Sequence, residues 1–325
     1  MKINKFTSLF ATCLLMGLTA CSNDNVSDAD YSNSAKDKDL TGKTSFSITS
    51  EAKTRTSGVY NSGVDFYWTP SDNIWVNSGS TTSPTLTASS SNNITSTTTS
   101  AKFYFDGTYT AASYPVRYTG NASTSGNTVT IATSQNQAEA NNATQLGTVG
   151  DCGVGTATRQ TDGSYKFTLS HKASYITFMP YYSKEALDAS AVVTQIKVEA
   201  ANGEKLAGTF NFSDSGLGAA NSSSNSVTLT LNGTSPTPGF PIPTTATASK
   251  NAAIMVVAPG TYSTFKVTYT LYDSVTGTNS TISYTYSGIN CTAGKNQVIK
   301  TDLGMETYTS RKTNYYMWDA KSNYW

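Results

Sequence analysis

The chain has 325 residues, only 13% of them charged, and its 22 Lys and Arg nearly balance its 21 Asp and Glu, for a formal net charge of +1. This balance leaves no positive field for a phosphate backbone, so we expect no nucleic-acid partner. A single histidine, His171, excludes multi-histidine metal sites and argues against histidine-based catalysis. We therefore expect a protein that is not an enzyme and that holds no cofactor and no metal.

The composition also favours strands over disorder. Ser and Thr make up about three residues in ten, and 11% of the residues are aromatic, including 20 Tyr. This aromatic content argues against disorder, and Thr and Tyr are strand formers. At roughly 100–200 residues per domain, the chain has room for two domains.

The N-terminus has the pattern of an export signal. Lys2 and Lys5 precede an apolar run over 6–18, which ends in Leu18-Thr19-Ala20-Cys21. The run is too short to span a bilayer. Its ending resembles the bacterial lipoprotein lipobox, which implies that residues 1–20 are a signal peptide and that Cys21 carries lipid.

A polar tether and a first strand follow the signal. Residues 22–43 have almost no apolar side chains, which is typical of a flexible tether. Phe46 and Ile48 then alternate with Ser and Thr over 44–49, which predicts a half-buried strand. The next segment, 53–58, is polar and exposes Arg55 to a trypsin-like protease.

Beyond Arg55, short alternating segments separated by Gly, Asn, Ser and Pro predict antiparallel sandwiches or barrels. Only 135–141 and 184–190 favour helices, and 78–100 reads as a long surface loop. The turn at Asp162-Gly163 predicts a boundary between two sandwiches, 56–162 and 163–303. The expected strands are 64–68, 74–76, 101–105, 111–118, 127–132, 164–170, 174–181, 192–200, 208–212, 226–231, 252–258, 264–272, 281–286 and 297–303.

The C-terminal tail, 304–325, is unusually aromatic and includes Tyr315, Tyr316, Trp318, Tyr324 and Trp325. Side chains of this kind usually mark contacts. Extended, about 20 residues span roughly 60–70 Å, enough to reach another subunit.

Two cysteines remain after the signal and the lipid are accounted for. Cys152 and Cys291 form a disulfide in one interpretation, because an exported pair can oxidise, and are two buried free thiols in the other.

His171 lies in an alternating segment, where a structural role is expected. The carboxylates are scattered singly, with no acidic pair for glycoside hydrolysis.

Together these features resemble the fimbrillins of Bacteroidetes, the lipoprotein precursors of type V pili. The matching parts are the lipobox at Cys21, the tether, and the strand before Arg55. The run from Trp68 to Asp72-Asn73-Ile74-Trp75-Val76 is similar to the family's W…D-x-I-x-V stretch, and residues 167–178 are similar to its F-x-x-x-H-x-x-S strand. In addition, Asp273-Ser274-Val275 resembles a Bacteroidetes O-glycosylation acceptor.

The resemblance implies an all-β fold of two transthyretin-like, Greek-key antiparallel β-sandwich domains. It also implies that an Arg-specific protease cuts between Arg55 and Thr56, which removes 21–55 with its first strand, and that an extended strand from another subunit fills the groove. The donor face implied here carries Tyr316, Trp318 and Ala320. The aromatic tail departs from a typical stalk subunit, which leaves the position in the fibre open.

The sequence therefore predicts a structural subunit of an adhesive surface fimbrium. Its expected partners are copies of itself or related subunits, the outer membrane through lipid on Cys21 before maturation, and a host protein or glycan as ligand. The alternative is a monomeric surface lipoprotein that binds glycans through exposed aromatic side chains.

Overall fold

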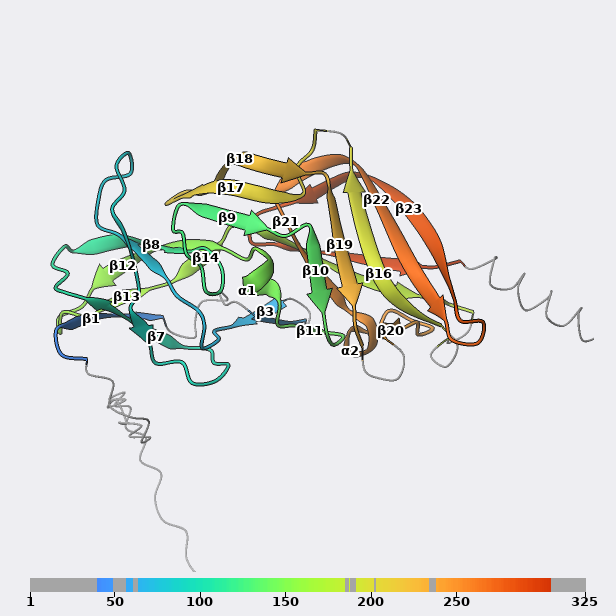
Figure 1. Cartoon of the computed structure of the whole chain (residues 1–325), viewed down its shortest axis with the longest axis horizontal. Coiled ribbons are helices and arrows are strands. Elements are labelled where there is room, and N and C mark those ends of the chain that lie inside the picture. The colour runs from blue at the N-terminus through green and yellow to red at the C-terminus, as the bar shows by residue number, and fades with distance from the viewer. Residues whose placement is uncertain are drawn as a thin grey trace, which may run out of the picture. The chain divides into compact units, whose positions relative to one another are not determined.

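A computed structural model of the chain describes residues 40–48, 57–60, 64–184, 187, 191–201, 203–233 and 238–304 (Figure 1). In this part of the chain, strands β1 to β24 account for nearly all regular structure. The two helices, α1 (Leu146–Val149) and α2 (Ala248–Asn251), have four residues each. The predicted all-β fold is confirmed. Neither helix of the described ranges has the length or the apolar character that crossing a membrane requires.

A nine-stranded sheet carries β1 in its interior. The strands follow the order β5-β4-β8-β12-β13-β1-β7-β6, and β14 also pairs with β12. Their bounds are β1 (Lys43–Ile48), β4 (Trp75–Asn77), β5 (Leu86–Ala88), β6 (Ser91–Asn92), β7 (Ala101–Asp106), β8 (Ser113–Tyr118), β12 (Gly153–Arg159), β13 (Tyr165–Phe167) and β14 (Leu169–His171). The side chains buried with this sheet, here called the aromatic cluster, are Phe46, Ile48, Trp68, Ile74, Val76, Ile94, Ala101, Phe103, Phe105, Val116, Tyr118, Ala157, Tyr165, Phe167 and Leu169.

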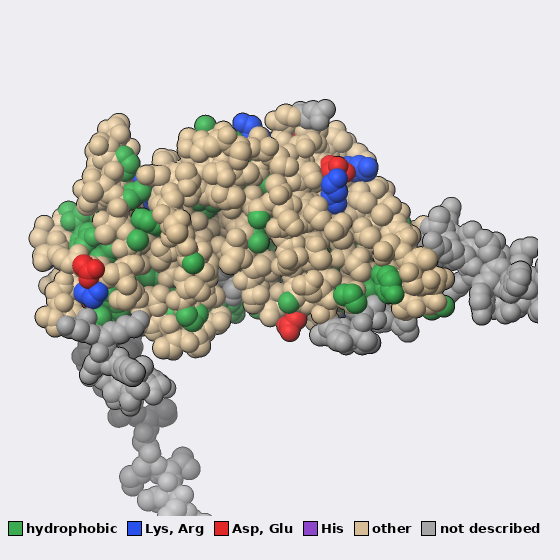
Figure 2. Space-filling view, in the orientation of Figure 1, with side chains coloured by type: hydrophobic (Ala, Val, Ile, Leu, Met, Phe, Trp, Pro, Cys, Tyr) green, Lys and Arg blue, Asp and Glu red, His purple; other side chains and the backbone are tan. Residues whose placement is uncertain are grey.

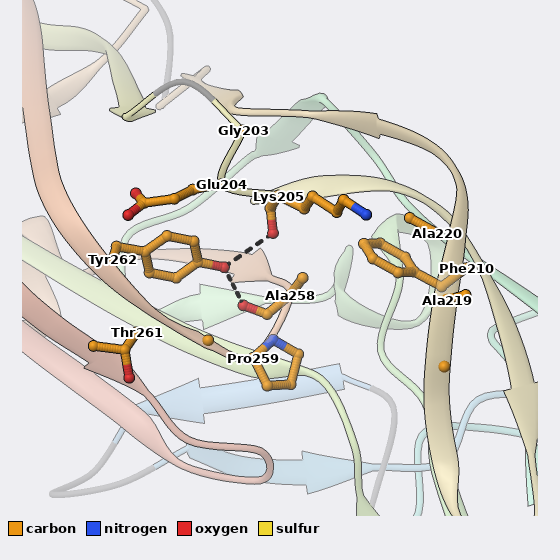
Figure 3. Close-up of a pocket in the computed structure, with 12 residues that line it drawn as sticks. Gly203, Glu204, Lys205, Phe210, Ala219, Ala220, Ala258, Pro259, Thr261 and Tyr262 are labelled. Carbon is orange, nitrogen blue, oxygen red and sulfur yellow. Dashed lines mark hydrogen bonds between the residues drawn. The ribbon is translucent and has the colours of Figure 1, made fainter.

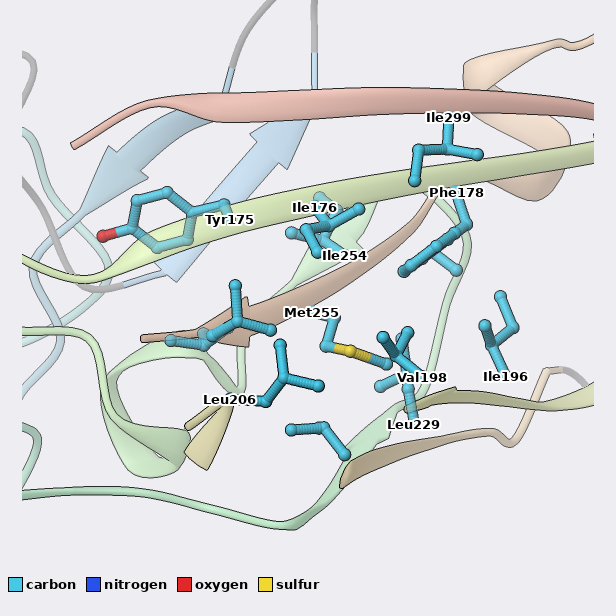
Figure 4. Packing of buried hydrophobic residues seen from close by; sticks show 14 of the residues in the cluster. Tyr175, Ile176, Phe178, Ile196, Val198, Leu206, Leu229, Ile254, Met255 and Ile299 are labelled. Atoms are coloured by element: carbon cyan, nitrogen blue, oxygen red, sulfur yellow. The ribbon is translucent and has the colours of Figure 1, made fainter. Parts of the chain in front are cut away.

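Four further sheets enclose a larger core, here called the aliphatic cluster, in which Ile176, Phe178, Ile196, Val198 and Met255 pack together (Figure 4). Their orders are β10-β19-β16-β22-β23 with β20 beside β16, β21-β15-β24, β18-β17-β9, and β11-β2-β3. The bounds are β2 (Ser57–Tyr60), β3 (Val64–Tyr67), β9 (Thr128–Ile131), β10 (Ser134–Gln137), β11 (Asn142–Ala143), β15 (Ser174–Tyr181), β16 (Ala191–Ala200), β17 (Ala207–Ser213), β18 (Gly216–Ser224), β19 (Ser226–Leu231), β20 (Phe240–Pro241), β21 (Ala253–Val257), β22 (Gly260–Asp273), β23 (Thr278–Cys291) and β24 (Asn296–Asp302).

Three strand pairs are parallel and so depart from the expected antiparallel pattern. They are β1 with β13, β10 with β19, and β15 with β24. Strand β15 is buried on both faces between β21 and β24, which explains why its sequence is a nearly continuous apolar run.

The helix predicted over 135–141 is wrong, because this segment begins with strand β10. Gln135 and Gln137 alternate inward with exposed neighbours and are fully buried. The Gln135 amide donates to the Val256 carbonyl at 2.8 Å, and its oxygen accepts from the Val256 N–H at 2.9 Å. Glutamine side chains therefore satisfy backbone groups of β21 that would otherwise be buried and unpaired. The other predicted helix, 184–190, lies mostly outside the described residues.

The boundary expected between 162 and 163 falls in the turn joining β12 to β13. These strands are hydrogen-bonded neighbours, with Thr158 opposite Lys166, so both sides of the boundary share one sheet. Conversely, β9 pairs with β17, and Val129 and Ile131 lie in the aliphatic cluster. The two clusters thus draw on interleaved stretches of chain, and the described residues from Thr41 onward belong to one compact unit.

Candidate functional site

Strand β1 occupies an interior position in the nine-stranded sheet, although it is the first strand of the described chain. It pairs in antiparallel register with β7, from Lys43 opposite Asp106 to Ile48 opposite Ala101. On its other side it runs parallel to β13, with Phe46 opposite Tyr165. Figure 1 shows β1 between these partners. Both backbone edges of a segment near the N-terminus are therefore used in pairing.

Phe46 anchors β1 in a pocket of aromatic rings. Its side chain is 0% exposed. The ring stacks on Tyr165 with centroids 4.5 Å apart and planes 8° from parallel, and it meets Phe105 edge-on at 4.9 Å. Tyr109 lies at 5.4 Å and Tyr114 at 6.4 Å. Edge-on and stacked pairs of this kind add to the gain from burial alone.

The rest of β1 is held by one further apolar contact and by polar contacts at its start. Ile48 is 2% exposed within the aromatic cluster. The Lys43 ammonium donates to Asp106 Oδ1 at 2.7 Å and to Ser90 Oγ at 2.9 Å. The Lys43 hydrogen bond lowers the pKa of the Asp106 carboxyl from its usual range. The strand is therefore apolar where it is buried and ionic where it meets solvent.

This arrangement has a clear physical consequence if β1 leaves. Strands β7 and β13 would each lose a backbone partner, and a pocket lined by aromatic side chains would open between them. Unpaired strand edges and exposed apolar grooves both favour pairing with another strand. The site is thus built to hold one β-strand that carries a large ring.

Most of the site residues expected from the sequence lie outside the described part of the structure. These are Cys21 for lipidation, Arg55 and Thr56 for cleavage, and Tyr316, Trp318 and Ala320 for the donor face. Phe46 and Ile48 are described and lie side by side on the buried face of β1. Ser274 lies in the exposed turn between β22 and β23. The sequence did not reveal Phe105, Tyr109 and Tyr165 as pocket residues, because nothing in it specifies which strands neighbour β1.

Cys152 and Cys291 are free thiols in the structure, and both are buried. The structure thus has the two cysteines in the arrangement of the second alternative, as buried thiols with no bond between them. Burial raises the pKa of Cys152 well above its ordinary value and that of Cys291 to about 11. Both groups are accordingly protonated and unreactive at neutral pH.

His171 belongs to a buried polar cluster rather than to an open cleft. Its Nδ1 lies 2.8 Å from Asp151 Oδ1, and the Phe66 ring covers it at a centroid distance of 4.1 Å. The Tyr175 hydroxyl donates to the same carboxylate oxygen at 2.5 Å. Burial raises the pKa of Tyr175 well above its ordinary value. The ring therefore has structural partners, in line with the sequence-based expectation.

A separate pocket of about 330 Å³ lies between β18 and the turn that joins β21 to β22 (Figure 3). Its aromatic side chains, Phe210 and Tyr262, are 5% and 2% exposed, so neither offers a ring face to a sugar. The Tyr262 hydroxyl donates to the Ala258 carbonyl at 2.6 Å. The Glu204 carboxylate accepts from the Ser263 N–H at 2.7 Å. The Tyr262 hydroxyl and the Glu204 carboxylate are thus engaged within the fold.

Comparison with known proteins gives structural similarity only. No protein-family model matches the chain, and no curated protein matches it. Among solved structures, the chain is similar to a proposed cell adhesion protein from Bacteroides uniformis, with 15% identity and a TM-score of 0.44 over 80% of this chain and 91% of that one. A proposed cell adhesion protein from Bacteroides fragilis has 12% identity and a TM-score of 0.37 over 79% and 92% of the two chains. A proposed adhesin from Bacteroides ovatus has 10% identity and a TM-score of 0.29 over 88% and 98%.

Proposed function

We propose that this chain is the precursor of an adhesive fimbrial subunit, exported as an outer-membrane lipoprotein through Cys21 and polymerised by strand exchange. The observation that carries the proposal is the interior position of β1. A strand with both edges paired and Phe46 fully buried is held by the fold, yet it lies only seven residues before Arg55. Cutting the chain after Arg55 leaves β1 attached by non-covalent contacts alone.

The pocket of Phe46 suggests how the tail replaces β1. Phe46 is followed two residues later by Ile48, and both side chains point to the buried face. Trp318 stands two residues after Tyr316 and two before Ala320. A tail strand running in the direction of β1 would place the Trp318 ring among the aromatic rings that Phe46 vacates. Strand addition of this kind combines main-chain hydrogen bonds with pockets for alternate side chains.

Exchange between copies would build a filament rather than a closed ring or dimer. The donor tail and the accepting groove are different surfaces of one chain, so each contact is head-to-tail. The partners in this proposal are copies of the chain or related subunits, and the assembled fimbrium stands at the cell surface. A host protein or glycan would then be bound by the polymer.

Limited proteolysis tests the proposal directly. We expect an Arg-specific, trypsin-like protease to produce a product that starts at Thr56 and forms a ladder of oligomers on electrophoresis without boiling. Arg55→Ala should abolish the ladder, whereas the control Arg159→Ala, at the exposed end of β12, should leave it intact. Trp318→Ala should shorten the ladder, and Asp319→Ala, on the other face of the tail, should not. A shortened monomer that is retained on a glycan column would instead support the monomeric lipoprotein.

A further inference from the structure

Strand β23 is a long sheet edge that lacks the usual protection. It is the outermost strand of β10-β19-β16-β22-β23, and within the described residues only β22 pairs with it. Its 14 residues contain no charged side chain and no proline, and its register with β22 does not shift along the hairpin. Natural sheet edges are usually short, charged, bulged, covered or interrupted by proline, because bare edges pair with other chains.

The other sheet edges of the described chain carry such protection. The edge strands β3, β5, β6, β9, β10 and β11 have only two to four residues each. Strand β18 shifts register twice against β17, which marks bulges. Strand β24 carries Lys300 and Asp302, and glutamine side chains occupy backbone groups of β21. The bare edge at β23 is therefore specific to that strand.

We propose that β23 pairs in antiparallel fashion with β23 of a second copy, joining the two sheets edge to edge about a two-fold axis. The absence of charge favours a second copy, because self-pairing opposes no like charges. Lys266, on β22 opposite Thr285, is the basic side chain of the adjoining strand. Three strand spacings, at least roughly 14 Å, would separate Lys266 of the two copies, and this exceeds the Debye length of about 8 Å at physiological salt. The face of the molecule in Figure 2 is likewise mostly uncharged, with few and scattered charged side chains.

The pattern of β23 selects a register for this pairing. Gly288 has a φ of 67° and ends the regular part of the strand, so that 278–287 remains, with Ser283 as one of its two central residues. With Ser283 opposite itself, Ile282 of one copy faces Tyr284 of the other, and Thr281 faces Thr285. Ile282 and Tyr284 are half-buried against the aliphatic cluster, and Thr281 and Thr285 are exposed. Isoleucine–tyrosine and threonine–threonine pairs are both favourable across strands.

The uncleaved full-length chain tests this pairing separately from strand exchange, because β1 still fills its own site. We expect sedimentation velocity at micromolar concentrations to detect a dimer. Thr281→Lys/Thr285→Lys should weaken it about tenfold, since two like-charged pairs then face each other, and Thr281→Glu/Thr285→Glu should do the same. An equimolar mixture of the two variants should restore dimers. The control Thr261→Lys/Thr264→Lys adds the same charge to β22 and should leave dimerisation unchanged.

A cysteine pair checks the register without altering charge. Ser283→Cys should cross-link between copies under mild oxidation, because residues directly opposite in an antiparallel pair have Cα atoms about 4.5–5.5 Å apart. The cysteine of Ser287→Cys, on the same strand, would lie roughly 27 Å from its equivalent in this register. Its cross-linking should therefore not exceed that of the unsubstituted chain. Circular dichroism would confirm that each variant is folded. A monomeric unsubstituted chain, a dimer that neither charged variant weakens, or equal cross-linking at both cysteines would overturn the proposal.

Discussion

Replacing Phe46 with Ala measures how strongly the aromatic pocket holds β1. A buried Phe covers about 200 Å² of surface, and at about 25 cal/mol per Å² its burial contributes roughly 5 kcal/mol as an upper bound. Core Phe→Ala substitutions cost about 3–5 kcal/mol. Phe46 is 0% exposed and touches Tyr165 and Phe105 at ring distances of 4.5 and 4.9 Å, so the site has little freedom to collapse. We expect a loss of about 4 kcal/mol.

The loss should appear in two measurements on the same variant. In the intact chain, urea unfolding should show a lower free energy of unfolding. In chain nicked after Arg55, the same 4 kcal/mol acts on retention of the β1 peptide, where it corresponds to roughly a thousandfold weaker association. Native mass spectrometry over a dilution series would follow the fraction of protein that keeps the peptide.

Ser47→Ala is the matched control for Phe46→Ala. Ser47 is the next residue on β1, is half-buried, and points to the face opposite Phe46. Its substitution should change either measurement by no more than about 0.5 kcal/mol. If the two variants unfold at the same urea concentration and release the peptide alike, the aromatic pocket does not hold β1 and the reasoning is refuted.

Three further outcomes are expected. Because the Lys43 hydrogen bond lowers the pKa of Asp106, this ion pair should help retain β1 above pH 3.8 and fail as the pH falls through the lower folded-state pKa. Peptide retention by Asp106→Asn should therefore depend less on pH in that window. Iodoacetamide should label neither Cys152 nor Cys291 in the folded chain at pH 7 and both in urea, as mass spectrometry would show; labelling only after reduction would contradict free thiols. Gly155→Ala should lower stability by about 1–3 kcal/mol in thermal unfolding, because the added methyl carbon would lie 2.0 Å from a facing carbonyl oxygen.

Strands with a strong apolar pattern could be predicted closely from the sequence. The expected bounds 174–181 and 226–231 coincide with β15 and β19, since one is a nearly continuous apolar run and the other alternates cleanly. Strand β10 could not be predicted, because its inward residues are glutamines, which are buried only by virtue of bonds to β21. Strand β18 was missed because Gly, Ala, Asn and Ser dominate its sequence.

Only one part of the candidate site, the strand that fills it, could be predicted from the sequence. Alternation placed Phe46 and Ile48 on the buried face of β1, as the structure has them. The pocket around them depends on pairing with β7 and β13, and local patterns carry no information about which distant strands meet. The interleaving of the two clusters was hidden for the same reason.

The parallel pairing of β1 with β13 also has a consequence for how the chain folds while it is being synthesised. Phe46 faces Tyr165, which is synthesised 119 residues later, or roughly 6–24 s at 5–20 residues per second. Until then β1 has no parallel neighbour, and closing so long a loop slows folding. The strand that emerges first must therefore wait for its site, and a chain truncated before Tyr165 would leave Phe46 without the ring that stacks on it.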